Sequence, residues 1–495
     1  MFEQLMRPFR KVGRTDKRLM RASAAIPATR ADDVLTKLSQ SANKARLWWV
    51  IAILLAVKKG PARRGALRGV AAIAGASLTA NLIGKPIFPR RRPAAELVPA
   101  HRRLVNRPTS SSFPSGHSAS AAAFVTAVAM ESPKAGLAVA PVAAAVAYSR
   151  VHTGVHWPSD VGAGIAIGLG AAAITRHWWP LHEDIPARTA HSADAPLMVD
   201  GEDMLVLVNP HSGVDGQDPT EDVRYAWPKA TLIYPDPKLD VREQLVQEIH
   251  MRGNSIRALG VAGGDGTVAA VAAVAADYHL PLALIPAGTL NHFARDVGVK
   301  DMPDADAATE AGSAVGIDLG EVEIDCAGET EQRWFVNTAS IGGYPEMVRL
   351  REKLQKRFPK WPSAAIAMVR ALRHAKPLEV ELNGKHAEVW LLFVGNGVYA
   401  PKGLAPSRRP ALDTGLLDVR YLRADLPYSR LRFVLAMLTN SLSASHVYVE
   451  LDLPELEVNL LNGNRRVATD GEVGPLGNVF RFKSRSSALT IYRTH

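Results

Sequence analysis

The chain has 495 residues, a formal net charge of +11, 47% hydrophobic residues and one cysteine. This length suits about three folding units, the apolar content excludes a disordered chain, and the lone Cys326 excludes a disulfide framework and a cysteine-based zinc site. Residues 1–195 hold 27 basic and 10 acidic residues, whereas 196–495 hold 32 basic and 38 acidic ones. Two parts of opposite charge indicate two tasks. The basic part is also Ala-rich and apolar, which favours a membrane surface over nucleic acid as its partner.

The pattern of apolar residues in the basic part, residues 1–195, predicts helices. Residues 1–46 form a basic, partly amphipathic lead-in, with apolar residues at helical spacing toward its end. Apolar Ala- and Gly-rich segments follow at about 47–57, 69–84, 118–130, 135–148 and 161–175. Each segment is shorter than the ~20 residues that cross a bilayer comfortably. Length alone therefore supports a soluble helical bundle almost as well as a membrane domain.

Two features favour the membrane. Tryptophan pairs at 48–49 and 178–179 bracket the apolar region, as aromatic residues at a membrane interface do. Residues 58–68 hold five basic residues and no acidic one, as a cytoplasmic loop does. We therefore expect a helical membrane domain over 47–178.

The character of the sequence changes after this region. Residues 179–200 lack periodicity and predict a linker. Three buried-strand runs then end in turns rich in glycine or asparagine, which predicts a parallel α/β lobe over 201–315. The runs are Met204–Val208, Ala258–Ala262 and Leu282–Ile285. Over 316–495 short strands predominate, interrupted by helical stretches at Met347–Arg357 and Ser363–His374, so a β-rich second lobe is expected.

Three polar clusters interrupt the apolar half. They are Lys85 with Arg92, then Ser115-Gly116-His117 at a predicted helix start, then Arg150 with His156 and Asp160. Cations near apolar helix ends need an anion, and backbone N–H groups that open a helix bind phosphate. His156 and Asp160 lie one helical turn apart, so the carboxylate can orient the imidazole for nucleophilic catalysis. A solvated basic face or a helix cap explains each cluster alone, but the three together predict a phosphate site.

In this order and spacing the clusters resemble the three signature motifs of the type 2 phosphatidic acid phosphatase superfamily, over about 60–175. The resemblance implies that His156 attacks phosphorus to give a phosphohistidine, that Asp160 orients it, and that His117 protonates the leaving oxygen. It also implies that no metal takes part. The phosphate oxygens would be held by Lys85, Arg92, Ser115, Gly116 and Arg150. Lipid members of the family usually have six spans, where five short apolar segments are visible here.

The second part contains a set of turns that can approach phosphates closely. Asn209-Pro210-His211-Ser212-Gly213, Gly263-Gly264-Asp265-Gly266-Thr267 and Gly288-Thr289-Leu290-Asn291 together resemble the diacylglycerol kinase catalytic family, shared with sphingosine and ceramide kinases, over about 200–495. The resemblance implies an α/β lobe and a β-sandwich lobe, ATP and Mg²⁺ as cofactors, and phosphate transfer to a lipid hydroxyl. The implied nucleotide-site residues are Asn209, Ser212, Gly264, Asp265, Gly266, Thr267, Gly288, Thr289 and Asn291.

The same resemblance supplies the remaining residues. Asp470-Gly471-Glu472 matches a late acidic motif, in which Asp470 would be the base for the acceptor hydroxyl and Glu472 would aid Mg²⁺, with Asp265 also counted as catalytic. Asp413 and Asp418 resemble a structural Mg²⁺ loop, although a surface turn explains this pair equally well.

The chain departs from the kinase pattern at two places. Ala269-Ala270 and Asn291-His292 stand where many members have Asn-Glu and Asn-Asp. Both replacements remove acids near the phosphates, and phosphoryl transfer depends on positioning and metal-assisted charge neutralisation. Slow transfer, or transfer to a different acceptor, is compatible with this pattern.

The sequence as a whole predicts a bifunctional lipid-phosphate enzyme. An all-α membrane domain would be a metal-independent lipid phosphatase, fused to an ATP- and Mg²⁺-dependent lipid kinase with an α/β lobe and a β-sandwich lobe. The expected substrates are phosphatidic acid and diacylglycerol or polyprenyl phosphates, with no nucleic-acid partner. The expected location is the cell membrane, multi-pass, with the kinase half in the cytoplasm.

Two other hypotheses for the function of the chain stay open. One is a phosphatase whose kinase-like half senses nucleotide or lipid without transfer, as Ala270 and His292 suggest. The other is a membrane-anchored scaffold with neither activity, which would require two complete sets of site residues to occur by coincidence.

Overall fold

The computed structural model describes residues 2–494 except 59, 180, 182–185, 213–217, 289–290, 327, 343–369, 371–375, 401, 403–407 and 440. The chain divides into two compact units, residues 1–183 and 184–495. The helical stretches expected at Met347–Arg357 and Ser363–His374 lie outside the described residues, except for Arg370.

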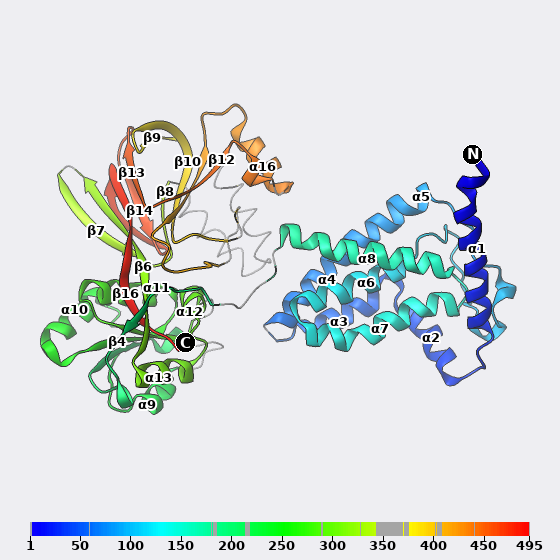
Figure 1. Cartoon of the computed structure of the whole chain (residues 1–495), viewed down its shortest axis with the longest axis horizontal. Helices are drawn as coiled ribbons and strands as arrows, with labels where there is room; N and C mark the ends of the chain where they lie inside the picture. The colour runs from blue at the N-terminus through cyan, green and yellow to red at the C-terminus, as the bar shows by residue number, and fades with distance from the viewer. Residues whose placement is uncertain are drawn as a thin grey trace. The chain divides into compact units, whose positions relative to one another are not determined.

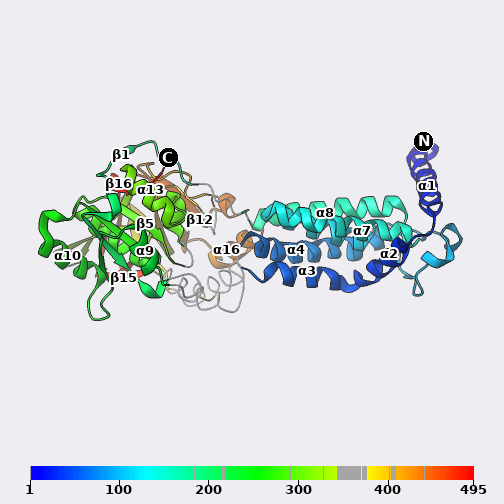
Figure 2. The same cartoon turned by 90° about the horizontal axis from the view of Figure 1, so that it is seen from below.

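The N-terminal unit is all-helical; its longer helices between residues 46 and 178 run side by side in both views, whereas the first helix stands at a steep angle to them (Figures 1 and 2). The helices are α1 (Phe2–Ala24), α2 (Arg30–Ser41), α3 (Arg46–Ala56), α4 (Pro61–Leu78), α6 (Gly116–Glu131), α7 (Pro133–His152) and α8 (Pro158–Trp178). A π-helical turn (Thr79–Gly84) and α5 (Lys85–Ile87) continue α4, and 3-10 turns lie at Asn43–Ala45, Ala95–Leu97 and Ala100–Arg102. The predicted helical class is confirmed.

Small residues explain how closely these helices pack. Ala76, Ala119 and Ala172 are fully buried where α4, α6 and α8 meet. A side chain added at Gly168 of α8 would collide with the Ala119 carbonyl oxygen of α6. Residues without bulk let helix backbones approach, as in membrane proteins.

The outer surface of this unit is apolar in places. Two helical segments among the described residues are long and apolar enough to cross a bilayer, Pro61–Ile87 and Pro158–His177. Large apolar side chains on α3 and on the turn after α4 are exposed, among them Ile53, Leu54 and Leu82 at 65%, 67% and 68%. Exposed apolar belts mark membrane or partner contacts. These features support membrane association, and the number of spans stays a prediction.

The C-terminal unit begins with a parallel α/β lobe (Figure 1). Its strands β2 (Met204–Val208), β3 (Thr231–Ile233), β4 (Ala258–Gly263) and β5 (Leu282–Pro286) pair in the order β3-β2-β4-β5. The flanking helices are α9 (Thr220–Ala226), α10 (Val241–Arg252), α11 (Asp265–Asp277), α12 (His292–Val297) and α13 (Met302–Ala311). The three predicted strand runs are confirmed to within one residue at their ends.

The second lobe is antiparallel. Its strands are β6 (Ser313–Cys326), β7 (Glu329–Phe335), β8 (Thr338–Gly342), β9 (Leu378–Leu382), β10 (Lys385–Asn396), β11 (Leu417–Arg423), β12 (Tyr448–Leu453), β13 (Glu455–Leu460), β14 (Arg465–Thr469), β15 (Glu472–Gly477) and β16 (Val479–Tyr492), and helix α16 (Ser429–Leu438) lies between β11 and β12. Residues such as Val322, Phe335 and Phe482 form its own buried core. The predicted α/β and β-rich lobes are confirmed.

The strand β16 connects the lobes in a way that the sequence did not indicate. The 14-residue strand β16 runs antiparallel to β6 through the second lobe and returns to the first, where Ile491 pairs in parallel with Leu282. Leu489, Ile491 and Tyr492 are buried in the core of the α/β lobe. The short strand β1 (Ser192–Asp194), within the predicted linker, also pairs with β6.

Candidate active sites

The three polar clusters of the helical unit meet at one end of the bundle. Lys85 ends the α4–α5 helix, His117 begins α6, Arg150 lies in the last turn of α7, and His156 follows in the loop before α8. Because neighbouring helices alternate in direction, these four positions fall at the same end. Electrostatic interactions join His117 to Lys85, Arg92, Arg150 and His156. We call this group, with Ser115, Gly116 and Asp160, the histidine site.

The buried ring of His156 has a defined proton position. Its Nδ1 lies 2.6 Å from the backbone carbonyl oxygen of Ser112. A carbonyl oxygen only accepts hydrogen bonds, so Nδ1 donates and the lone pair lies on Nε2. Arg92 Nη1 lies 3.4 Å from this Nε2. The nitrogen of the predicted nucleophile therefore lies beside a cation that can hold a phosphate oxygen.

The surroundings keep His156 neutral. Burial, together with the positive charges of Arg150 and Arg92, lowers the pKa of His156 to about 4, although Asp160 opposes this shift. At neutral pH the Nε2 lone pair is therefore available for attack.

Asp160 is fully buried, and its oxygens have several partners. Its Oδ2 lies 3.7 Å from His156 Nδ1 and accepts a hydrogen bond from the Trp157 backbone N–H at 2.9 Å. Its Oδ1 accepts from Arg90 Nη1 at 2.6 Å. The shortest contact to His156 Nδ1 thus comes from the Ser112 carbonyl, which sequence reasoning missed. The orienting role of Asp160 stays a prediction.

A second carboxylate from the lead-in joins this network. Asp16 of α1 is 2% exposed and accepts hydrogen bonds from Arg90 Nη2 at 2.6 Å and from the Ser159 backbone N–H at 2.9 Å. Arg90 therefore bridges Asp16 and Asp160. Sequence reasoning missed both Asp16 and Arg90. The available signal was that Asp16 is the single acidic residue between Glu3 and Asp32 in a basic segment.

The predicted phosphate ligands differ in their surroundings. Ser115 is buried and caps α6, since its hydroxyl accepts from the Ser118 backbone N–H at 3.4 Å. Gly116 follows it as the first residue of that helix, close to Asn81. Arg150 is 1% exposed and donates from Nη1 to Ser39, while its buried Nε has no hydrogen-bond partner within the described part of the chain. A buried guanidinium with an unused donor is suited to an anionic ligand.

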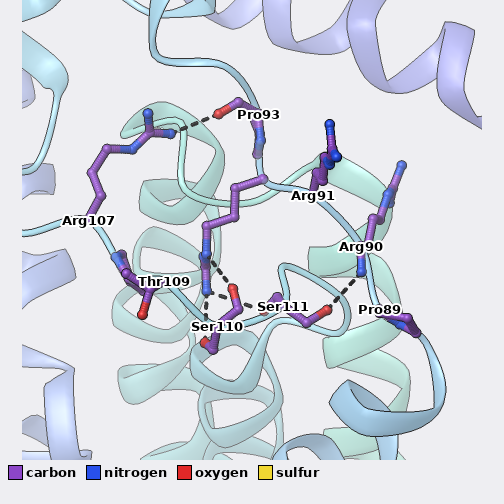
Figure 3. Close-up of a pocket in the computed structure, with 10 residues that line it drawn as sticks. Pro89, Arg90, Arg91, Pro93, Arg107, Thr109, Ser110 and Ser111 are labelled. Carbon is purple, nitrogen blue, oxygen red and sulfur yellow. Dashed lines mark hydrogen bonds between the residues drawn. The ribbon is translucent and has the colours of Figure 1, made fainter.

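A basic pocket adjoins the histidine site. It is lined by residues 89–93 and 107–111, and Figure 3 shows their arginine and hydroxyl side chains around it. Arg92 Nε donates to the Ser110 carbonyl at 3.0 Å, and Arg107 Nη2 donates to the Pro93 carbonyl at 2.9 Å. Both guanidinium groups thus bind neutral carbonyl oxygens here, which leaves the pocket positively charged. Such a pocket favours an anionic substrate.

In the C-terminal unit the predicted turns meet at the carboxyl edge of the parallel strands. A Cβ atom at Gly288 would lie 2.7 Å from the Cα of Gly264 and 2.7 Å from Asn291 Oδ1. The turns after β4 and β5 are therefore in contact, and glycine is required at position 288. Asn209 N donates to the Ala262 carbonyl at 2.9 Å, which joins the turn after β2 to β4. We call this group the glycine-turn site.

The other predicted members of the glycine-turn site lie in the same turns. Asp265 begins α11, and its Oδ1 accepts from the His292 backbone N–H at 2.8 Å. Ser212 Oγ donates to the Asn209 carbonyl at 2.7 Å. Gly266 is exposed, and Thr267 packs against Gly263. Thr289 lies outside the described residues.

The carboxylate of Asp470, in the late acidic motif, is already hydrogen-bonded to the protein backbone. Asp470 accepts hydrogen bonds from the backbone N–H groups of Val336 at 2.7 Å, Asn337 at 2.7 Å and Thr338 at 3.0 Å. Burial raises the pKa of Asp470, while these three donors and Arg409 oppose the shift. Its carboxylate thus anchors the start of β8, and its role as a base stays a prediction. Glu472, two residues on, is exposed.

The two residues of the predicted metal loop have protein partners of their own. Asp418 is buried and pairs with Arg420 Nη2 at 2.6 Å, while Asp413 Oδ2 accepts from the Ala190 backbone N–H and lies 3.3 Å from His191 Nδ1. Across the described residues no group of three or more His, Cys, Asp or Glu side chains is placed to hold a metal. The Mg²⁺ assignment of Asp413 and Asp418 stays a prediction.

Arg409 is a residue that no motif indicated. It is 1% exposed, and it donates from Nε to Asp296 Oδ2 at 2.8 Å and from Nη1 to the Val336 carbonyl at 2.7 Å. Its guanidinium also lies over the rings of Phe293 and Tyr399. Arg409 therefore joins α12, which follows the glycine turn, to the backbone that Asp470 anchors. Its sequence context, an ordinary basic loop, gives no sign of this.

Comparisons with known proteins agree with this division. Residues 65–184 match the PAP2 superfamily, and residues 203–322 match the diacylglycerol kinase catalytic domain. A Pseudomonas fluorescens protein named "Probable lipid kinase YegS-like" is 33% identical over 261 residues, which cover 50% of this chain and 81% of that protein.

Two solved structures are also similar. A diacylglycerol kinase from Bacillus anthracis is 19% identical, with a TM-score of 0.41, over 59% of this chain and 97% of its own. A transmembrane PAP2 type phosphatidylglycerolphosphate phosphatase from Bacillus subtilis is 21% identical, with a TM-score of 0.28, over 34% of this chain and 85% of its own.

Proposed function

Because the chain belongs to the diacylglycerol kinase catalytic family and carries a PAP2 superfamily domain ahead of it, we propose that it is a bifunctional lipid-phosphate enzyme. The helical unit removes a phosphate from a lipid by way of a phosphohistidine, without a metal. The C-terminal unit transfers the γ-phosphate of ATP to a lipid hydroxyl.

The phosphatase proposal rests on one observation: a neutral histidine, His156, lies close to arginines to which no carboxylate is bound within the described residues. His156 presents Nε2 beside Arg92, and the buried Arg150 keeps an unused Nε donor. In the proposed reaction Nε2 attacks phosphorus while the bond to the leaving oxygen breaks. His117, as an imidazolium, gives its Nε2 proton to that oxygen and is left neutral, and the cations stabilise the charge that develops on the phosphoryl group. Water then displaces the phosphate from His156, and the leaving water proton returns to His117.

The kinase proposal is supported by the contact between the glycine turns, because such turns can bring backbone N–H groups close to phosphates. When bound with ATP, Mg²⁺ neutralises phosphate charge, and it needs only one or two carboxylates besides the phosphates themselves. The residues present fit that requirement, since Glu472 is exposed and Asp265 lies at the glycine turn. We assign Glu472 to the metal and keep Asp470 as the base for the acceptor hydroxyl.

The proposed substrates are phosphatidic acid and diacylglycerol, or a polyprenol and its phosphates, because both families imply lipids. The proposed location is the cell membrane, with the helical unit crossing it several times. The histidine site lies at the opposite end of the helical unit from Trp178, after which the chain continues to the C-terminal unit. If α8 crosses the membrane, the kinase half would then be cytoplasmic and the phosphatase site would face outward.

The experiment uses full-length His156→Ala protein in detergent with total lipid extract, Mg²⁺ and γ-labelled ATP. Without the nucleophile, the phosphatase cannot remove the kinase product. A labelled lipid is expected, and its chromatographic identity names the acceptor. Wild-type phosphatase activity toward phosphatidic acid should survive EDTA, whereas lipid labelling should not. Loss of phosphatase activity in EDTA would overturn the metal-independent mechanism.

A second candidate function has a specific observation in its favour. The carboxylate of Asp470 is held by three backbone N–H groups, and His292 and Ala270 stand where acids are frequent. These features favour a C-terminal unit that binds nucleotide or lipid as a sensor without transfer. ATP binding without any labelled lipid in the experiment above would select this candidate.

A further inference from the structure

The lead-in contacts the residue that the proposed function makes the general acid. His117 Nε2 lies 2.9 Å from Asn43 Oδ1, in the 3-10 turn Asn43–Ala45 that joins α2 to α3. This turn precedes the PAP2-matched range, which begins at residue 65.

The direction of this hydrogen bond shows that His117 carries a proton on Nε2. An amide oxygen only accepts, so His117 donates from Nε2, and the proton available for transfer lies on the nitrogen that faces Asn43. Asn43 itself is exposed, so this side of the ring is accessible to a substrate. The electrostatic neighbours of the same ring are Lys85, Arg92, Arg150 and His156. The imidazole therefore lies between the phosphate-binding cations and Asn43.

The helix before this turn is firmly attached to the site. Asp32 of α2 is 5% exposed, and its Oδ1 lies 3.1 Å from Arg102 Nε and 2.9 Å from His152 Nε2. Ser39 of the same helix accepts from Arg150 Nη1. Two anchors thus hold α2, and the position of Asn43 over His117 follows from them.

From this geometry we propose that Asn43 is a positioning residue for the general acid of the phosphatase reaction, an inference that rests on the proposed function. Asn43 accepts the hydrogen bond from Nε2–H of His117 and so aims that proton at the place of the leaving oxygen. On substrate binding the leaving oxygen replaces the amide oxygen as acceptor. As His156 Nε2 bonds to phosphorus, the bond from phosphorus to that oxygen breaks, and the oxygen takes the Nε2 proton of His117, which enters the step as an imidazolium and is left as the neutral ring with its proton on Nδ1.

The test exploits the leaving group. An alkoxide leaves only with a proton, whereas p-nitrophenolate leaves without one, so only alkyl phosphates depend on the general acid. A general acid typically raises the rate about 10²- to 10⁴-fold. Full-length wild type, Asn43→Ala and Asn43→Asp are compared on phosphatidic acid and on p-nitrophenyl phosphate. Asn43→Ala should lower kcat on phosphatidic acid by about 10-fold or more and leave kcat on the aryl ester within about 2-fold. Asn43→Asp, which keeps an acceptor oxygen, should restore the wild-type ratio of the two rates.

The matched control is Ser41→Ala, because this exposed hydroxyl donates only to the Leu38 carbonyl of its own helix. Equal losses on both substrates in Asn43→Ala would overturn the inference, because a purely structural role affects both. If Asn43→Ala does not fold, the same ratio is measured in Asn43→Ser, whose side chain is too short to reach Nε2. A wild type that hydrolyses neither substrate would overturn the proposed phosphatase function instead.

Discussion

The histidine site and the glycine-turn site are built from different parts of the chain. The histidine site consists of charged side chains from helix ends and loops, in which Arg90 bridges two carboxylates and Arg92 flanks the nucleophile. The glycine-turn site consists of backbone that follows parallel strands, where Gly288 touches Gly264. In the proposed reactions the first would hold its ligand by fixed charges, and the second by the shape of its turns and by N–H groups.

This difference predicts how each site fails. A site of charged side chains loses its function when one charge or one proton position changes, while its backbone stays in place. A site of backbone turns loses its function when bulk is added, even if no charge changes. The predictions below use one or the other kind of change, from the largest expected effect to the smallest.

The largest effect is expected for His156→Ala. Removing the nucleophile should lower phosphatase turnover by about 10⁴-fold or more, as for other nucleophiles of a covalent mechanism. Hydrolysis of phosphatidic acid by purified protein measures this. His101→Ala is the matched control, since that half-exposed histidine contacts Asp32 rather than the site. A comparable loss in the control would indicate that the loss reflects folding.

Gly288→Ala tests the backbone-built site. The added methyl carbon would meet Gly264 Cα and Asn291 Oδ1 at 2.7 Å, so the two turns must move apart. A displacement of about 1 Å costs about 10²-fold in rate, and we expect this loss in lipid phosphorylation with unchanged phosphatase activity. Gly266→Ala should lose less, because its added methyl meets no atom within 4 Å. Equal losses in the two variants would contradict a role for turn contact.

Asp16→Asn tests the charge network of the histidine site. The amide keeps the shape of the side chain but carries no negative charge, so Arg90 then forms an ion pair with Asp160 alone. Loss of such a supporting partner costs about 10-fold in kcat, measured on phosphatidic acid with KM determined in parallel. Asp33→Asn, on the exposed face of α2, is the control and should stay near wild type. A wild-type rate in Asp16→Asn would show that Arg90 needs no second carboxylate.

The two sites also differ in how much the sequence reveals. The strands of the α/β lobe were predictable because Met204–Val208 and its counterparts are short buried runs that end in glycine or asparagine turns. The convergence of the polar clusters followed from their positions at helix ends. Asp16 and Asn43 were not predictable, since they lie 143 and 74 residues from their partners Ser159 and His117 and reach the site only through tertiary packing. The return of β16 to the first lobe was hidden for the same reason, because an apolar strand carries no mark of its partner.

The smallest expected effect is a shift in pH dependence, which belongs to the charge-built site alone. The pKa of His156 is lowered to about 4 by burial and by two arginines, and only the neutral ring attacks phosphorus. Phosphatase kcat/KM of the free enzyme should therefore fall as the pH drops through about 4, rather than through the usual histidine range near 6.5.

Asp160→Asn should shift the acid limb of the pH–rate profile to lower pH. Asp160 raises the pKa of His156, so its neutralisation lowers that pKa further and shifts the acid limb to lower pH, while the maximal rate also falls. The kinase activity of the same variant, whose site shares no residue with this network, is the internal control. An acid limb that stayed in place would mean that the Ser112 carbonyl, at 2.6 Å, holds the His156 ring without help from Asp160.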